Sequence, residues 1–151
     1  FEYKDDPGKT EEGRVGDGFF TLGDVGYLDE DGFLFLCDRR ADIIISGGIN
    51  IYPAQIESVL MEIDAVADCC VVGVPSEEWG EAVRAVVRLE AAAGVASTTA
   101  ETILGHCRAR LASHQVPRAV DFVEDLPRTE TGKLARRLIR DPYWADRDRR
   151  V

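Results

Sequence analysis

The sequence predicts an α+β fold, in which a small β-sheet carries helices packed on it and is preceded by a β-hairpin. Two short β-prone runs flank residues 29–32, whose D-x-D-G pattern favours a hairpin turn. After Pro53 the apolar residues recur at helical spacing. Two longer runs, 66–74 and 82–89, are rich in valine and are typical of strands. Strands and helices in this order predict one sheet with helices on it.

The first part of the chain predicts the hairpin. Residues 1–18 are polar and rich in Gly, Asp and Lys, which predicts a surface segment. Residues 19–28 and 33–37 then predict the two strands. A charged break at 38–42 follows and is the best boundary in the sequence. We therefore expect residues 1–38 and 39–151 to belong to different domains, and, since the chain begins without Met, to be part of a longer polypeptide.

The second part predicts a strand at 43–45 and a helix that begins near Pro53, a residue tolerated in a first helical turn. The apolar stripe of this helix, at positions i, i+3, i+4 and i+7, consists of Ile56, Val59, Leu60 and Ile63. The remaining elements are expected in the order strand 66–74, strand 82–89, small-residue loop 91–97, helix 99–112, strand 120–123 and helix 134–139.

Composition excludes several classes of function. A net charge of −10 argues against nucleic acid as the main partner. No apolar run approaches the roughly 20 residues of a membrane span, and the first residues lack the features of a signal peptide. The four cysteines show neither CxxC spacing nor a nearby histidine pair, so we expect reduced, mostly buried thiols, no metal site and a cytoplasmic location.

Three segments carry residues suited to chemistry. Asp24 follows a glycine and has the carboxylate that ribose hydroxyls require, although an Asp after Gly is also common in turns. The Ser46-Gly47-Gly48 segment lets the backbone approach a ligand, or is a simple turn between a strand and a helix. Lys133 follows Thr129, Thr131 and Gly132 in a flexible loop, where a cation could reach a reacting phosphate or simply lie on the surface. Residues 128–151, with eight basic and four acidic side chains, could likewise face phosphates or solvent.

Taken in order, these segments resemble the C-terminal region of the adenylate-forming superfamily, which includes acyl-CoA synthetases, firefly luciferase and nonribosomal peptide synthetase adenylation domains. The resemblance rests on three stretches, Phe19–Glu57, Glu77–Val87 and His114–Arg140. It implies an acid–thiol ligase that uses ATP and Mg²⁺ to form an acyl-adenylate from a carboxylic acid and then transfers the acyl group to coenzyme A.

The resemblance also implies roles for single residues. Lys133 corresponds to the lysine that contacts the reacting groups during adenylation. Asp24 and Arg39 correspond to nucleotide-binding residues, and the loop Ser46, Gly47, Gly48 to the lining of the pantetheine tunnel.

Two positions depart from the family pattern. Ala41 stands at the hinge, where Asp or Lys is usual, and Asn50 stands where some acetate-activating relatives have an arginine that contacts coenzyme A. The resemblance assigns residues 1–38 to the tail of a large N-terminal domain and 39–151 to a complete mobile domain. The missing large domain would hold the acid, most of the nucleotide and the Mg²⁺, so we expect the chain alone to be inactive.

Two other functions are compatible with the sequence. A nonribosomal adenylation domain would load a carrier protein instead of coenzyme A, but the chain ends at residues 143–151 without a carrier segment, which favours free coenzyme A. A non-catalytic binding module that kept the fold is disfavoured because Asp24, Lys133 and the two glycines are all present. The acid itself cannot be read from these residues.

Overall fold

The chain divides into two compact units, Phe1–Ala41 and Asp42–Val151. The structure, a computed structural model, describes residues 2–91 and 98–145. The division falls three residues later than the boundary expected at Asp38, and Arg39 belongs to the first unit because it ends a strand of the hairpin. The assignment of each unit to a domain of a larger enzyme stays a prediction.

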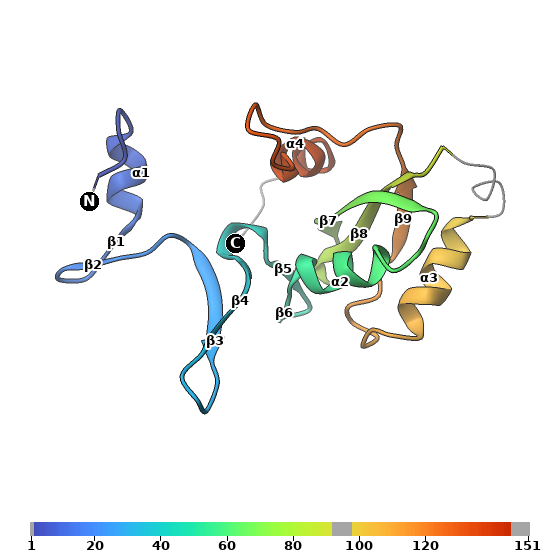
Figure 1. The fold of residues 1–151 in the computed structure, drawn as a ribbon, viewed down its shortest axis with the longest axis horizontal. Helices are drawn as coiled ribbons and strands as arrows, with labels where there is room; N and C mark the ends of the chain where they lie inside the picture. Colours follow the sequence, from blue (N-terminus) through green and yellow to red (C-terminus); the bar gives the residue numbers. More distant parts are fainter. Residues whose placement is uncertain (1, 92–97, 146–151) are drawn as a thin grey trace. The chain divides into compact units, whose positions relative to one another are not determined.

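The first unit contains a short helix and two antiparallel strand pairs (Figure 1). Helix α1 is Pro7–Glu12, β1 (Arg14–Val15) pairs with β2 (Phe19–Phe20), and β3 (Asp24–Leu28) pairs with β4 (Leu34–Arg39). The short 3-10 helix η1 (Arg40–Asp42) then spans the division between the units.

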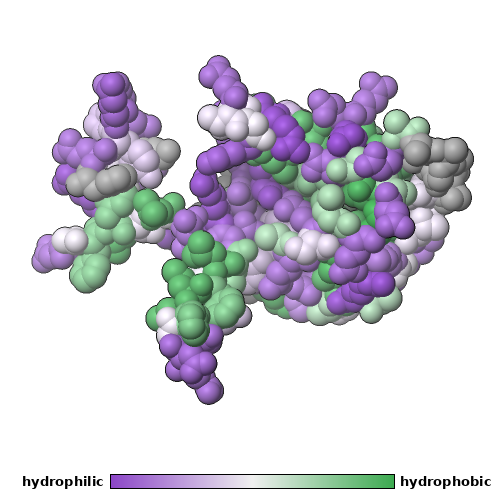
Figure 2. Space-filling view, viewed as in Figure 1, coloured by the Kyte–Doolittle hydropathy of each residue, from purple (hydrophilic) through white to green (hydrophobic). Residues whose placement is uncertain are grey.

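The β3–β4 hairpin confirms the prediction from the D-x-D-G turn. The Asp29 carboxylate accepts hydrogen bonds from the backbone N–H of Asp31 at 3.0 Å and of Phe33 at 2.8 Å, which closes the turn. The strands that it joins are apolar yet exposed, and Figure 2 shows them as a green surface with a purple tip. The large exposed side chains are Tyr27, Leu28, Phe33, Leu34, Phe35 and Leu36.

The second unit is built on one five-stranded sheet with the order β6-β5-β8-β7 and with β9 also paired to β8. All pairs are antiparallel except β8–β9, which is parallel. The strands are β5 (Ile44–Ser46), β6 (Ile49–Ile51), β7 (Val66–Ser76), β8 (Gly80–Leu89) and β9 (Ala119–Phe122). The helices are α2 (Pro53–Leu60), α3 (Ala100–Arg108), α4 (Arg136–Arg140) and the 3-10 helix η3 (Asp141–Trp144).

Two apolar cores lie on opposite faces of this sheet because successive strand residues point to opposite sides. Along β7, Cys69 and Val71 pack under α2 and α3, whereas Cys70 and Val72 pack on the side of α4 with Ile139. Figure 1 shows α2 and α3 on one side of the strands and α4 on the other.

The α+β fold class is confirmed, and the structure corrects several details of the predicted elements. The expected strand at 19–28 is divided into β2, which pairs with β1, and β3, which pairs with β4. The expected order had no strand at 49–51, but β6 lies there and pairs with β5. Gly47 and Gly48 therefore form the turn of a β-hairpin rather than a strand-to-helix turn. Helix α3 ends at Arg108 instead of residue 112, and α4 begins at Arg136 instead of residue 134. Most of the expected loop at 91–97 lies outside the described residues. Among the described residues no helix is long and apolar enough to cross a membrane.

Candidate functional site

Lys133 lies in a small loop that is closed by backbone hydrogen bonds. At its base the Ala135 N–H donates to the Pro127 carbonyl at 2.8 Å. Inside it, the Thr129 N–H donates to the Lys133 carbonyl and the Gly132 N–H donates to the Thr129 carbonyl, both at 2.8 Å. Gly132 has φ +80°, a conformation that favours glycine. The expected flexible loop is therefore an internally bonded turn, and Lys133 is exposed on it.

The ammonium of Lys133 forms no ion pair with any carboxylate in residues 2–91 and 98–145. The arginines that flank it are both paired: Arg128 binds Asp68, and Arg136 binds Glu57. No ion pair in that part of the chain therefore competes with an incoming anion for this amine. The loop therefore presents one uncompensated cation between two neutralised ones.

Arg136 ties this loop to three other elements. Its Nη1 and Nη2 form a two-point contact with the Glu57 carboxylate of α2, at 2.5 and 3.1 Å. Nη1 also donates to the Val71 carbonyl of β7 at 2.6 Å, and Nε lies 3.5 Å from the Asp42 carboxylate. The Glu57 carboxylate in turn accepts the Val71 N–H at 2.7 Å. Burial by itself would lower the pKa of Arg136, but the hydrogen bond and charge of Glu57 outweigh it, so the pKa is raised and the guanidinium stays charged.

The glycine pair forms the two-residue turn between β5 and β6. Both glycines have positive φ, +57° at Gly47 and +81° at Gly48, as such turns require. The Gly47 N–H donates to the Trp79 carbonyl at 2.8 Å, and a Cβ at Gly47 would lie 2.8 Å from the Trp79 ring. A Cβ at Gly48 would meet open space. Ser46 pairs with Gly80 of β8, so the turn projects from the sheet beside the start of β8.

Asp24 and Arg39 face each other across the β3–β4 hairpin. They are directly paired in its register, and the Arg39 Nε lies 3.7 Å from an Asp24 carboxylate oxygen. Both side chains remain accessible, with 37% of Asp24 and 70% of Arg39 exposed. Ala41 lies in η1, the last residue of the first unit.

Glu81, for which the sequence suggests no role, is only 3% exposed. Its carboxylate accepts the Ile45 N–H of β5 at 3.2 Å and so joins β5 to β8. The alternation of β8 contains the signal, because residue 81 has the same parity as the buried Val83 and Ala85. No pattern in the sequence indicates that Arg128 and Arg136 pair with Asp68 and Glu57.

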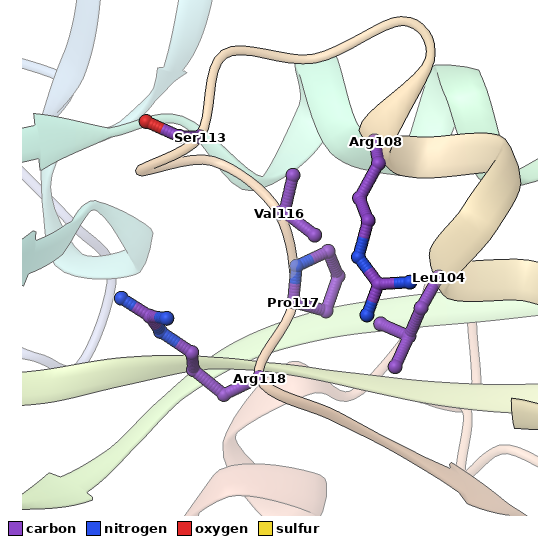
Figure 3. A pocket seen from close by; sticks show the side chains of 6 residues that line it. All are labelled: Leu104, Arg108, Ser113, Val116, Pro117 and Arg118. Carbon is purple, nitrogen blue, oxygen red and sulfur yellow. The ribbon is translucent and has the colours of Figure 1, made fainter. Parts of the chain in front are cut away.

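A cavity of about 330 Å³ lies between α3 and the segment that precedes β9. Figure 3 shows Arg108 and Leu104 on the helix side, with Pro117 and Arg118 on the other. None of the residues that the sequence singles out for chemistry lines it. Within the described part of the chain, no group of three or more His, Cys, Asp or Glu side chains could hold a metal ion.

Comparisons with known proteins identify relatives of nearly the whole chain. It is 47% identical over 123 residues to the 2-succinylbenzoate–CoA ligase of Geobacillus kaustophilus, covering 82% of this chain and 24% of that protein. It is 39% identical over 144 residues to the long-chain-fatty-acid–CoA ligase FadD13 of Mycobacterium tuberculosis, covering 95% and 28%. The chain therefore spans about a quarter of the length of these relatives.

The fold matches a solved structure of the same kind. The o-succinylbenzoate CoA synthetase of Bacillus subtilis, in complex with an acyl-adenylate intermediate, gives a TM-score of 0.81 at 37% identity, over 91% of this chain and 27% of that one. A model of the AMP-binding enzyme C-terminal domain family matches residues 55–133, from helix α2 to Lys133. The resemblance to the adenylate-forming superfamily is thus confirmed, and the chain belongs to its family of AMP-binding enzyme C-terminal domains.

Proposed function

We propose that this chain is the C-terminal portion of an ATP-dependent acyl-CoA synthetase. The enzyme activates a carboxylic acid in two steps and uses free coenzyme A as the acceptor. Residues 1–38 form the tail of its large domain and residues 39–151 its mobile domain. The named relatives, which are CoA ligases about four times as long, support this proposal. So does the exposed apolar hairpin, because a large apolar surface of this kind is normally covered by further protein.

The observation that carries the proposal is the Lys133 ammonium, which forms no ion pair within the part of the chain that the structure describes. In the first step a carboxylate oxygen of the acid attacks the α-phosphorus of ATP, and the bond to the bridging oxygen of pyrophosphate breaks. Negative charge develops on the phosphate oxygens in the transition state. An exposed lysine at the end of a closed loop, without an ion pair to any carboxylate in residues 2–91 and 98–145, is suited to neutralise that charge.

Asp24 and Arg39 bind the nucleotide in this proposal. The Asp24 carboxylate accepts hydrogen bonds from the ribose hydroxyls, and the Arg39 guanidinium stays close to the phosphate-bearing part of the nucleotide. Their position on facing strands lets one hairpin supply both groups. The Mg²⁺ that accompanies ATP is held mainly by residues outside this chain.

The second step uses the β5–β6 turn. The thiol sulfur of coenzyme A attacks the acyl carbon of the adenylate, the bond from that carbon to the phosphate oxygen breaks, and AMP leaves. The turn Ser46–Gly48 lines the path of the pantetheine arm, and the open space over Gly48 leaves room for it. Ala41 lies at the division between the two units. Backbone rotation at Ala41 reorients the mobile domain between the first step and the second.

The full-length enzyme that contains this chain provides the test. Lys133→Ala should lower the rate of acyl-adenylate formation, measured by ATP–pyrophosphate exchange, about 100-fold. The rate of acyl-CoA formation from supplied acyl-adenylate should stay close to wild type. Equal losses in both steps would refute the role of Lys133. Adenylate formation without transfer to free coenzyme A would instead indicate a carrier-protein acceptor.

A further inference from the structure

The peptide group that joins Gly132 to Lys133 is held at both ends. Its carbonyl, on Gly132, accepts a hydrogen bond from Nη1 of Arg128 at 2.9 Å. Its N–H, on Lys133, donates to the Thr129 hydroxyl at 3.2 Å. A peptide group is planar, so two contacts on opposite edges fix the orientation of the whole plane. The Lys133 carbonyl also accepts the Thr129 N–H at 2.8 Å, so the peptide groups on both sides of the Lys133 Cα are held and the direction in which its side chain leaves the backbone is restricted.

Arg128 connects this peptide to the rigid sheet. While Nη1 binds the Gly132 carbonyl, Nη2 of the same guanidinium binds the Asp68 carboxylate of β7. Asp68 is 20% exposed and pairs with Arg88 of β8 next to a bulge between Val66 and Asp68, and its carboxylate also accepts the Cys69 N–H at 2.9 Å. The planar guanidinium of Arg128 thus connects Gly132, whose backbone is conformationally free, to the β7–β8 strand pair.

We propose that Arg128 is a positioning residue for Lys133, which sets the direction of the amine by bridging the Gly132 carbonyl to Asp68. This inference rests on the proposed role of Lys133 in adenylation. Arg128 itself touches no reacting atom. Its loss leaves the charge of Lys133 intact but lets the Gly132–Lys133 peptide rotate, so the amine is misplaced during the first step.

The exposure of Arg128 makes the inference testable. Arg136, the other flanking arginine, has a side chain only 16% exposed, and its removal would leave the half-buried carboxylates of Glu57 and Asp42 without a cation. Arg128 is 48% exposed and its partner Asp68 is 20% exposed, so removal of Arg128 lets water reach Asp68, which still accepts the Cys69 N–H at 2.9 Å. Chemical denaturation of each Arg128 variant checks that it stays folded before its rates are compared. The pair Arg110–Glu62, at 2.8 Å with 46% of Arg110 exposed, is a matched control away from the loop.

The experiment compares Arg128→Gln, Arg128→Lys and Arg110→Gln in the full-length enzyme. Arg128→Gln should lower kcat of adenylation about tenfold, because small misplacements of a reacting group are costly. Acyl-CoA formation from supplied adenylate should change less than about twofold. Arg128→Lys should lose as much, since a lysine ammonium cannot make the forked contact. Arg110→Gln should leave both steps unchanged.

A second readout needs no activity. A protease that cuts after lysine should cleave at Lys133 at least about threefold faster in Arg128→Gln than in wild type, because the peptide has lost one anchor. The inference is overturned if Arg128→Gln adenylates at the wild-type rate, if Arg128→Lys restores that rate, or if both steps fall together. Lys133→Ala in the same assays separates the two hypotheses. If it is also without effect, the proposed function fails. If it alone is impaired, only the role of Arg128 fails.

Discussion

The two glycines of the β5–β6 turn are constrained in different ways. Gly47 cannot accept a side chain because its Cβ would collide with the Trp79 ring. Gly48 has open space around it, so only its positive φ disfavours other residues. A substitution at Gly48 therefore adds bulk to the outer surface of the turn with limited effect on packing within the lobe.

Gly48→Leu in the full-length enzyme should lower the rate of acyl-CoA formation from supplied adenylate at least about tenfold, by obstructing the thiol. The rate of adenylate formation should be unchanged. Gly48→Ala carries the same backbone strain with little bulk and serves as the control. Rapid-quench measurement of each step checks this, and an unimpaired second step in Gly48→Leu would remove the turn from the pantetheine path.

The buried thiols of β7 predict a loss of stability at high pH. Burial raises the pKa of Cys69 and of Cys70 from 9.0 to about 12. Above pH 9 the unfolded chain releases these protons while the folded chain keeps them, so the free energy of unfolding falls as pH rises toward 12. Each thiol contributes a slope of up to about 1.4 kcal/mol per pH unit in this window. Urea titrations of the 151-residue chain from pH 8 to 11 should show a shallower fall in Cys70→Ala, and equal slopes would contradict the prediction.

At the scale of elements, the helices and strands that carry a clear local sequence pattern were predicted, and those without one were missed. The helical stripe from Ile56 to Ile63 and the valine-rich runs gave α2, β7 and β8 because burial on one or two faces leaves a period in the sequence. Strand β6 was missed because three residues, Ile49–Ile51, are too few to show alternation. The Gly47-Gly48 pair was nevertheless a hairpin signal in its own right.

The candidate site divides in the same way. Lys133, Asp24 and the glycines could be singled out because each lies in a recognisable local segment of the sequence. Their functional roles stay predictions. The pair Arg136–Glu57 joins residues 79 positions apart and the pair Arg128–Asp68 joins residues 60 apart. No local pattern specifies such partners.

The Arg136 network attaches α4 to Glu57 of α2, to the Val71 carbonyl of β7 and to Asp42. Arg136→Met should lower the free energy of unfolding by roughly 3 kcal/mol, because it leaves Glu57 and Asp42 without a cation. Arg137→Met, on the same helix, should cost at most about 0.5 kcal/mol, since Arg137 is 78% exposed and its ion pair spans 3.8 Å. Chemical denaturation of both variants checks this. Equal costs would mean that the network contributes no more than a surface pair.

At the scale of the whole molecule, the two units differ in how they hold together. Within the described residues both apolar cores lie in the second unit, whereas the first unit exposes most of its large apolar side chains. Residues 42–151 should therefore unfold cooperatively with the same thermal midpoint as the 151-residue chain. They should also bind less of a hydrophobic dye, because the β3–β4 hairpin is removed. A lower midpoint would show that the first unit stabilises the sheet.

The same organisation bears on activity. The purified 151-residue chain should form no measurable acyl-CoA or acyl-adenylate from ATP, coenzyme A and a panel of carboxylic acids. The physical reason is that the acid and most of the nucleotide would be bound outside this chain. The full-length enzyme is the positive control, and turnover by the chain alone would contradict the proposed division of labour.

The position of the Glu81 carboxylate next to β7 restricts which residues the second unit can have at position 73. A methyl group at Gly73 would lie 2.3 Å from a Glu81 oxygen and 3.2 Å from Ile44. The Glu81 carboxylate therefore occupies the volume that a side chain at position 73 would need. The two positions are sterically coupled, because an alanine at 73 requires a shorter side chain at 81. A shorter side chain at 81 would in turn lose the hydrogen bond from the Ile45 N–H that joins β5 to β8. Sequences in which both positions vary should therefore show paired changes, with glycine at 73 and glutamate at 81 as one allowed combination.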